Sequence, residues 1–378
     1  MRIVLVADGD LPQYPDCSRD PDVLTTGLRS LGHAVTLLRV SAAVPRPAAP
    51  PPTSQPTQSI VPAVPAYLPT DRDVVPPADV VLSLGRAAPP VAAVLAEASG
   101  SPLVISLPTD LLLPAQPVSA GYSRLVCQHL PSACLLVDFP RHLHAAEKLG
   151  ADRHKIFVLP PGMALTASAT APAQAPLRVL CDVSRTPLPD QQFLARILTR
   201  LTTTRGRTIR AAVIASPSGD TPLTRTRALW ERLNALPATV HPVDGEAATE
   251  LYRSCDVVVV PSSDSDATVT MLRAMAAARA VLACDSAHIR DVASTVRHGV
   301  LARPGQENEW IDKLDYLLDE AALRSHLGRG ARTRVENAFS LSHTLRCIDD
   351  RLTAVTAAWR YVAQANLSSL SSSLLEPM

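Results

Sequence analysis

The stretch PSSDSDATVTMLRAMAAARAVLACDS, from Pro261 to Ser286, follows the apolar run DVVVV and contains a helix pattern and then a strand pattern. Spaced apolar residues in TVTMLRAMAAA are typical of a helix, and the short apolar run AVLACD is typical of a buried strand. A strand, a helix and a second strand in this order form a βαβ unit, whose two strands run parallel in one sheet. The stretch therefore predicts an α/β fold.

The same alternation continues on both sides of this stretch and divides into two series. The apolar runs of the first series are RIVLVAD (Arg2–Asp8), AVTLLRV, ADVVLSLG, PLVISLP, ACLLVDF and KIFVLPPG. Those of the second series are LRVLCDV, AAVIAS, ATVHPV, DVVVVPS, AVLACD and GVLARP. Two parallel-sheet domains in tandem are predicted. Ligands of such sheets bind at the carboxyl ends of the strands, so we expect a cleft between the two domains.

The domain boundaries follow from changes in composition. We predict a first domain at 1–162, a linker at 163–176, a second domain at 177–340, a C-terminal helix at 341–366 and a tail at 367–378. Residues 44–77 are rich in proline, which lacks the amide donor and fixes φ, so this insertion is expected to lie on the surface outside sheets and helices.

Composition excludes several classes of protein. The 378 residues are 47% hydrophobic and carry a net charge of +1, which argues against a nucleic-acid binder. Seven cysteines without a C-x-x-C pair predict buried thiols in a reducing compartment. Because no run of about 18 apolar residues occurs, we expect no membrane span. The opening MRIVLVADGD is expected to be a strand and not a signal peptide, which predicts a cytoplasmic protein.

Six segments, in this order, resemble the retaining GT-B glycosyltransferases (glycosyltransferase group 1, or family 4-like), which use nucleotide-sugar donors. The segments are LRSLGHAVTLL, LGADRHKIFVLPPGM, YRSCDVVVVPS, RAMAAARAVLACD, HGVLARPG and LGRGARTRVENAFS. The resemblance implies a GT-B fold of two Rossmann-like domains with an interdomain cleft and C-terminal helices packing back. It also implies transfer of a sugar from a UDP-, GDP- or ADP-sugar to an acceptor.

The resemblance also implies a donor site with altered motifs. The two glutamates of the family, eight positions apart, fall on Ser265 and Arg273. The second change replaces an acceptor of ribose hydroxyl hydrogen bonds with a guanidinium, which only donates. The family's diphosphate-binding Arg falls on Arg185, and its Lys partner falls on Asp190. Its first-domain Gly-Gly turn, its sugar-binding His and its second Gly pair fall near Pro15–Asp16, near Pro108 and at Ala287–His288.

The donor-site candidates that the resemblance implies are Arg185, Ser265, Asp266, Ala267, Thr268, Val269 and Arg273. Arg185 would balance the diphosphate, and Arg273 would contact a phosphate or an acidic sugar. Amides near Ala267, Thr268 and Val269 open a helix and would face a phosphate. In the alternative interpretation, Asp264 and Asp266 cap that helix themselves and Arg273 pairs with one of them. No catalytic residue is assigned, and no cofactor is expected besides the donor substrate.

Other motifs favour plain structural roles. The D-x-D triplets at 8–10 and 264–266 resemble the metal site of GT-A enzymes, but the tandem architecture argues against a metal here. His142 and His144 lie on different faces of a helix and are expected at the surface. Cys284 is expected to be a small buried residue, not a nucleophile.

Two function classes stay open from the sequence. The first is a divergent glycosyltransferase that transfers a sugar to an unknown acceptor. The second is a catalytically inactive relative that binds a protein partner, which the changes at the family's Glu, Lys, Gly and His positions favour. A sugar-nucleotide epimerase is a third interpretation, but it requires acid/base residues that the sequence does not place in the cleft.

We expect Arg185→Ala to weaken the binding of a nucleotide-sugar donor, because the substitution removes the cation assigned to the diphosphate. Calorimetric titration of the variant and of the unaltered chain with the same nucleotide measures this. An unchanged dissociation constant would remove Arg185 from the donor site.

Overall fold

The chain is represented by a computed structural model. It describes residues 1–9, 16–40, 76–85, 88–107, 133–165, 176–184, 186–215, 223–232, 238–242, 245–293 and 296–373. The chain divides into two compact units. Unit 1 comprises Met1–Tyr14, Ser18–Pro160 and Thr344–Met378, and unit 2 comprises Pro15–Cys17 and Pro161–His343.

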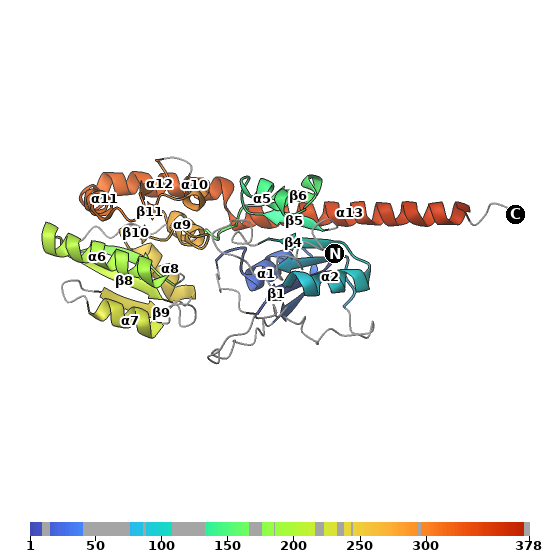
Figure 1. Cartoon of the computed structure of the whole chain (residues 1–378), viewed down its shortest axis with the longest axis horizontal. Coiled ribbons are helices and arrows are strands. Elements are labelled where there is room, and N and C mark those ends of the chain that lie inside the picture. Colours follow the sequence, from blue (N-terminus) through green and yellow to red (C-terminus); the bar gives the residue numbers. More distant parts are fainter. Residues whose placement is uncertain are drawn as a thin grey trace, which may run out of the picture. The chain divides into compact units, whose positions relative to one another are not determined.

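Unit 1 is built on a parallel sheet with the strand order β2-β1-β3-β4-β5-β6. Its strands are β1 (Arg2–Asp8), β2 (Ala34–Val40), β3 (Val80–Leu84), β4 (Leu103–Ser106), β5 (Cys134–Val137) and β6 (Ile156–Val158). Its helices are α1 (Pro21–Ser30), α2 (Ala88–Ser99), α5 (His142–Lys148) and the short η2 (Arg153–Lys155), with most of α13 (Leu341–Ser373). All six strands predicted for the first series are confirmed (Figure 1).

Unit 2 contains the second parallel sheet, with the order β12-β11-β10-β7-β8-β9. Its strands are β7 (Leu177–Asp182), β8 (Ile209–Ala215), β9 (Ala238–Pro242), β10 (Val257–Val260), β11 (Ala280–Cys284) and β12 (Val300–Ala302). Its helices are α6 (Leu188–Arg205), α7 (Leu223–Glu231), α8 (Gly245–Ser254), α9 (Ala267–Ala276), α10 (Ala287–Val292), α11 (Glu307–Asp319) and α12 (Ala321–Ala338). The two parallel sheets of the predicted α/β fold are therefore confirmed.

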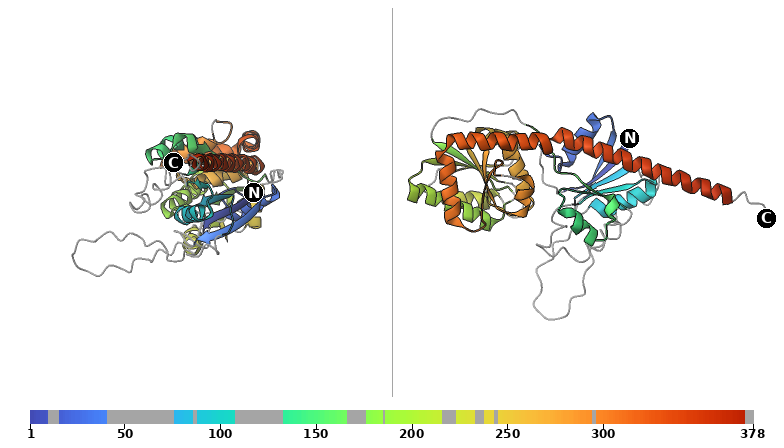
Figure 2. Two further views of the ribbon diagram at one scale, coloured as in Figure 1. Left: turned by 90° about the vertical axis from the view of Figure 1, so that its right-hand side faces the viewer. Right: turned by 90° about the horizontal axis from the view of Figure 1, so that it is seen from above.

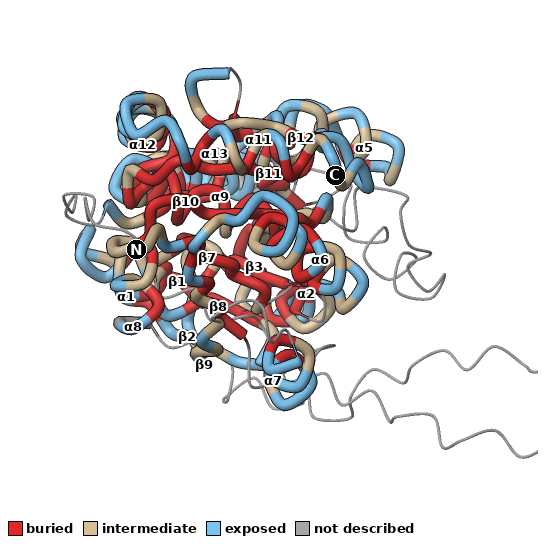
Figure 3. Tube along the Cα trace, turned by 90° about the vertical axis from the view of Figure 1, so that its left-hand side faces the viewer, coloured by how far each residue is buried: buried red, intermediate tan, exposed pale blue. Residues whose placement is uncertain are grey.

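The core of unit 2 forms where helices cover the sheet. One cluster joins alternate residues of the strands to α6, α7 and α11, and it includes the fully buried Trp230 and Trp310. Helix α9 lies against β10 and β11 and contacts α12, and nine of its ten residues are buried. Figure 3 shows the buried residues in red along the strands. Apolar burial on both faces explains why these strands read as continuous apolar runs.

Two features depart from the predicted boundaries. Helix α13 continues to Ser373, past the predicted end at 366. Residues Pro15–Cys17 belong to unit 2, although the chain on either side of them belongs to unit 1. Most of the proline-rich insertion and most of the linker lie outside the described residues.

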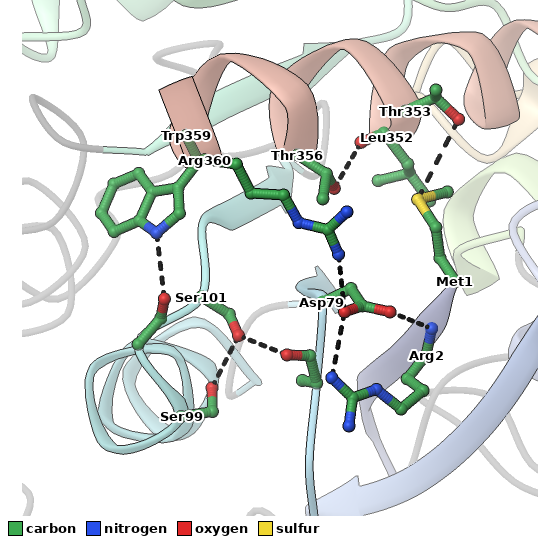
Figure 4. Close-up of polar contacts among 12 residues, drawn as sticks. Met1, Arg2, Asp79, Ser99, Ser101, Leu352, Thr353, Thr356, Trp359 and Arg360 are labelled. Atoms are coloured by element: carbon green, nitrogen blue, oxygen red, sulfur yellow. Dashed lines mark hydrogen bonds and ion pairs between the residues drawn. The ribbon is translucent and has the colours of Figure 1, made fainter. Parts of the chain in front are cut away.

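Helix α13 is held against unit 1 by polar contacts along its length. Figure 2 shows it as a long red helix that runs across this unit. The Asp79 carboxylate accepts hydrogen bonds from Arg360 Nη2 at 2.9 Å and from the backbone and side chain of Arg2 at 2.7 and 3.1 Å (Figure 4). Trp359 Nε1 donates to the carbonyl of Gly100 at 2.9 Å. These bonds tie the helix to β1 and to the segments that flank β3 and β4.

Cysteines in the described part of the chain form no disulfide. Cys17, Cys181, Cys255 and Cys284 are buried, as expected, whereas Cys134 and Cys347 are half-buried and Cys127 lies outside the described residues. Burial raises the pKa of Cys255 to about 12 and that of Cys284 to about 11, so these thiols are weak nucleophiles at neutral pH.

None of the helices in the described part of the chain combines the length and the apolar character needed to cross a bilayer.

Asp79→Asn is expected to lower the free energy of unfolding by about 1 kcal/mol at pH 7, because the hydrogen bond from Arg2 holds the pKa of this carboxyl at about 2 and solvent screens part of the interaction. A depressed pKa stabilises the fold above the unfolded value of 3.8 and loses that effect as the pH falls to about 2. Urea unfolding at pH 7 and pH 3 measures this. A difference between variant and parent that does not shrink at the lower pH would contradict it.

Candidate functional site

The carboxyl edge of the unit 2 sheet brings three loops together. β7 ends at Asp182, β10 at Val260 and β11 at Cys284, and the strands pair in the order β11-β10-β7. In parallel sheets the loops after neighbouring strands meet at one edge, where ligands bind. Among the candidates that the structure describes, all except Arg273 lie in the β10–α9 loop or in the first turn of α9.

The β10–α9 loop is organised by Asp264. Its Oδ1 accepts the Ala267 amide at 3.2 Å, and its own amide donates to Ser262 Oγ at 3.3 Å. Asp266 lies at the N-cap position, but its side chain makes no capping bond. The expected capping of α9 by aspartate is therefore found for Asp264 and not for Asp266. Ser265 and Asp266 are half-buried at the start of the helix.

The first three amides of α9 already have acceptors within the chain. Asp264 binds the Ala267 amide, while the Thr268 amide donates to the Ser265 carbonyl at 3.2 Å and the Val269 amide to the Asp266 carbonyl at 3.0 Å. The side chains of Thr268 and Val269 are fully buried. A phosphate at this helix end would therefore have to displace Asp264 or share these amides.

Asp190 adds a second half-buried carboxyl near Asp264. Burial raises the pKa of Asp190, a hydrogen bond from Ser262 lowers it, and the nearby Asp264 charge raises it further. Burial likewise raises the pKa of Asp264, which also bonds to Ser262 and is repelled by Asp266. Two carboxyls that share one hydroxyl in a low-dielectric place are suited to hydrogen bonding with hydroxyl groups, because each accepts bonds when ionised and also donates when protonated.

Arg273 does not pair with Asp264 or Asp266, so that expectation is wrong. Its Nε lies 2.9 Å from both carboxylate oxygens of Asp16, and its Nη2 lies 2.6 Å from Oδ1. Only 8% of the Arg273 side chain is exposed. Burial alone lowers the pKa of the guanidinium, but the Asp16 carboxylate more than reverses this and the pKa is raised. The residue is 257 positions from Asp16 in sequence, so no local pattern could indicate the pair.

Asp182 is a second carboxylate near Arg273, and sequence reasoning missed it. Its Oδ2 lies 3.8 Å from Arg273 Nη1 and accepts the Tyr252 hydroxyl at 2.7 Å. Its Oδ1 accepts both the amide and the hydroxyl of Ser184, at 3.1 and 2.6 Å. Burial and the Asp182 charge raise the pKa of Tyr252, so this phenol stays a donor. The carboxylate therefore fixes the first turn of the loop after β7.

The β11–α10 loop joins the same edge. The His288 Nδ1 lies 3.0 Å from the carbonyl of Ser263, which ties the start of α10 to the β10–α9 loop. Asp285 pairs with Arg290, and the shortest distance between their side chains is 2.6 Å. Cys284 is buried behind these loops, as expected.

Some predictions lie elsewhere or outside the description. Arg185 lies outside the described residues, and the cleft between the domains stays a prediction. His142 and His144 do lie on different faces, since the side chain of His144 is 73% exposed. The expectation that both are surface residues is wrong, however, because His142 is fully buried and packs edge-on against Phe139. Among the described residues, no group of three or more His, Cys, Asp or Glu side chains is placed to hold a metal.

Comparison with known proteins finds similarity to glycosyltransferases. Residues 183–320 match the family "Glycosyl transferases group 1". The chain is 30% identical over 240 residues to the D-inositol 3-phosphate glycosyltransferase of Nocardia farcinica, covering 57% of this chain and 50% of the relative. It is 32% identical over 296 residues to the Geodermatophilus obscurus protein of the same name, covering 71% and 60%. The chain thus spans about half to three fifths of these relatives.

Solved structures share the fold. A glycosyltransferase from Rickettsia africae superposes with a TM-score of 0.71 at 15% identity, over 94% of this chain and 98% of that one. The Anabaena protein HepE, in complex with UDP and glucose, also gives 0.71 at 15% identity, over 94% and 100%. The predicted GT-B fold is confirmed by these likenesses.

Asp264→Ala is expected to lower the free energy of unfolding by about 1 kcal/mol, because the Ala267 amide loses its capping acceptor. Asp264→Asn is the matched control. It retains a capping oxygen and removes the repulsion from Asp266, so we expect it to be as stable as the parent. Chemical denaturation of the three proteins measures this, and equal losses in both variants would contradict the capping role.

Proposed function

We propose that this chain is a GT-B glycosyltransferase that transfers a sugar from a nucleotide-sugar donor to an acceptor. The match of residues 183–320 to the group 1 family carries this proposal, since those residues include the three loops at the carboxyl edge of the unit 2 sheet. The same edge is where a parallel sheet binds its ligand.

Within this edge, we assign the donor contacts by charge. Arg185 follows the loop turn that Asp182 and Ser184 form, and its cation would neutralise the departing diphosphate. Asp190 and Asp264 would accept hydrogen bonds from hydroxyls of the sugar or ribose, which suits two half-buried carboxyls better than contact with phosphate. Ser265 and Asp266, half-buried beside them, would complete the polar lining.

Helix α9 would assist through its dipole more than through its first amides. The amides of Ala267, Thr268 and Val269 have acceptors in the chain, but the positive end of the helix still favours an anion nearby. Arg273 contacts the carboxylates of Asp16 and Asp182, which argues against a contact with a phosphate or an acidic sugar.

Names of the relatives and neighbours suggest which substrates to test first. HepE has been crystallised with UDP, glucose and UDP-glucose, so UDP-glucose is the first donor to test. The curated relatives are named for D-inositol 3-phosphate, which is the first acceptor to test. A cytoplasmic location and a protein partner remain further proposals from the sequence.

The test is calorimetric titration of the full chain with UDP, GDP and ADP, with and without Mg²⁺, followed by a transfer assay with the sugar form of the nucleotide that binds. We expect micromolar binding of one nucleotide, weakened about tenfold by Asp190→Ala through the loss of a charged hydrogen-bond partner. Asp312→Ala is the matched control, because Asp312 is an exposed carboxylate in an ion pair with Arg205, on α11 and α6.

Absence of binding to all three nucleotides would contradict the proposal. Binding without transfer or hydrolysis of the donor would instead favour the catalytically inactive relative. The control variant separates loss of a ligand contact from a general effect of removing one surface charge.

A further inference from the structure

Arg273 stands where four separate parts of unit 2 meet. The residue itself belongs to α9, Asp182 ends β7, Tyr252 lies on α8, and Asp16 comes from the short segment Pro15–Cys17. Arg273 contacts Asp16 through three N–H···O bonds of 2.6 to 2.9 Å and lies 3.8 Å from Asp182. The four residues form what we term the Arg273 cluster.

Arg273 is the one cation of the Arg273 cluster, which also contains the two carboxylates of Asp16 and Asp182. Asp182 is 1% exposed and Asp16 is 19% exposed at their side chains, and Arg273 lies against both carboxylates. A buried carboxylate that loses its cation becomes an uncompensated charge, which is far costlier than the loss of a surface pair. Arg273 is therefore the cation that compensates the charge of both carboxylates.

The two carboxylates differ in how they are held. Asp182 also accepts bonds from the Tyr252 hydroxyl and from the amide and hydroxyl of Ser184. All side-chain bonds recorded for Asp16 among the described residues go to Arg273. Asp182 thus extends the cluster to the loop after β7.

Backbone contacts fix the rest of the Asp16 segment. The Asp16 carbonyl accepts the Ala164 amide at 2.7 Å, and Cys17 forms an isolated bridge with Met163. Met163 in turn bridges Ser340. This segment is therefore held by side-chain hydrogen bonds to Arg273 and by backbone contacts with Met163 and Ala164.

We propose that Arg273 is a positioning residue that holds both the loop after β7 and the Asp16 segment through its two carboxylates. The effect on the donor rests on the proposed function, which assigns Arg185 to the diphosphate. In sequence, Arg185 directly follows Ser184, the residue that Asp182 holds. Arg273 touches no donor atom in this scheme, since its guanidinium faces carboxylates of the chain itself. It acts on the donor through Asp182 and Ser184.

Three variants separate the two branches of the cluster. Arg273→Met removes the shared cation, Asp16→Asn removes one carboxylate charge, and Tyr252→Phe removes one donor to Asp182. Amide hydrogen exchange, followed by mass spectrometry on the full chain without nucleotide, reports each branch locally.

We expect Arg273→Met to speed exchange at least tenfold both at residues 16–18 and at residues 183–187. Asp16→Asn is expected to affect residues 16–18 and to leave 183–187 unchanged, because Asp182 keeps Arg273. Tyr252→Phe is expected to speed exchange at residues 183–187 and to leave residues 16–18 unchanged, because it removes a donor to Asp182. Arg205→Met, which removes an exposed Arg–Asp pair, is the matched control and should alter neither segment.

Unchanged exchange at residues 183–187 in Arg273→Met would overturn the proposal. If that variant does not fold, Arg273→Lys replaces it, because an ammonium keeps the charge and loses the forked contacts to Asp16. The Lys variant should then speed exchange at residues 16–18 and spare residues 183–187. Rapid exchange at both segments after Asp16→Asn would also overturn the proposal, because the branches would not be separate.

The ligand measurement tests the link to the donor. Arg273→Met should weaken nucleotide binding about tenfold, and Asp16→Asn less than threefold. Equal weakening in both variants would overturn the assignment of the donor effect to Asp182. If the parent chain binds no nucleotide, the proposed function fails, whereas the exchange experiment still tests the cluster by itself.

Discussion

Burial of the unit 2 strands on both faces is the constraint on which the rest of the structure depends. A parallel sheet covered by helices has no solvated face, so its strands consist of apolar residues and its polar chemistry is confined to the edges. Val257–Val260 and Ala280–Cys284 are entirely buried. Asp182, Asp190, Asp264 and Asp285 lie in or beside the loops at the carboxyl edge, because the parallel strands end there together.

That edge is unusually acidic for a site expected to receive a diphosphate. Asp264 caps α9, Asp190 shares Ser262 with it, and Arg290 neutralises Asp285. These three carboxyls therefore have defined partners: Asp264 caps a helix and shares a serine with Asp190, and Asp285 is paired with an arginine. Asp190, which stands where the family pattern has a lysine, is therefore part of a hydrogen-bonded group of side chains at this edge.

Long-range ion pairs organise both units in a comparable way. In unit 1, Asp79 joins Arg2 of the first strand to Arg360 of the last helix. In unit 2, Arg273 joins Asp16 near the start of the chain to Asp182 at the end of β7. The Arg273 pair is the more buried of the two, so its energetic consequences are larger. The joining residue, an aspartate in unit 1 and an arginine in unit 2, holds a segment that lies outside the sheet: α13 in unit 1 and the Asp16 segment in unit 2.

The sequence by itself determined the twelve strands, the parallel sheets and the capping of α9, because these depend on apolar periodicity and on residues a few positions apart. It also placed the loops at the carboxyl edge of the unit 2 sheet, since the ends of apolar runs mark them. Only the tertiary structure decided the partner of Arg273, the burial of His142 and the membership of Pro15–Cys17 in unit 2. The physical reason is that a charge pairs with whichever opposite charge the fold brings within about 4 Å, and no local pattern records that distance.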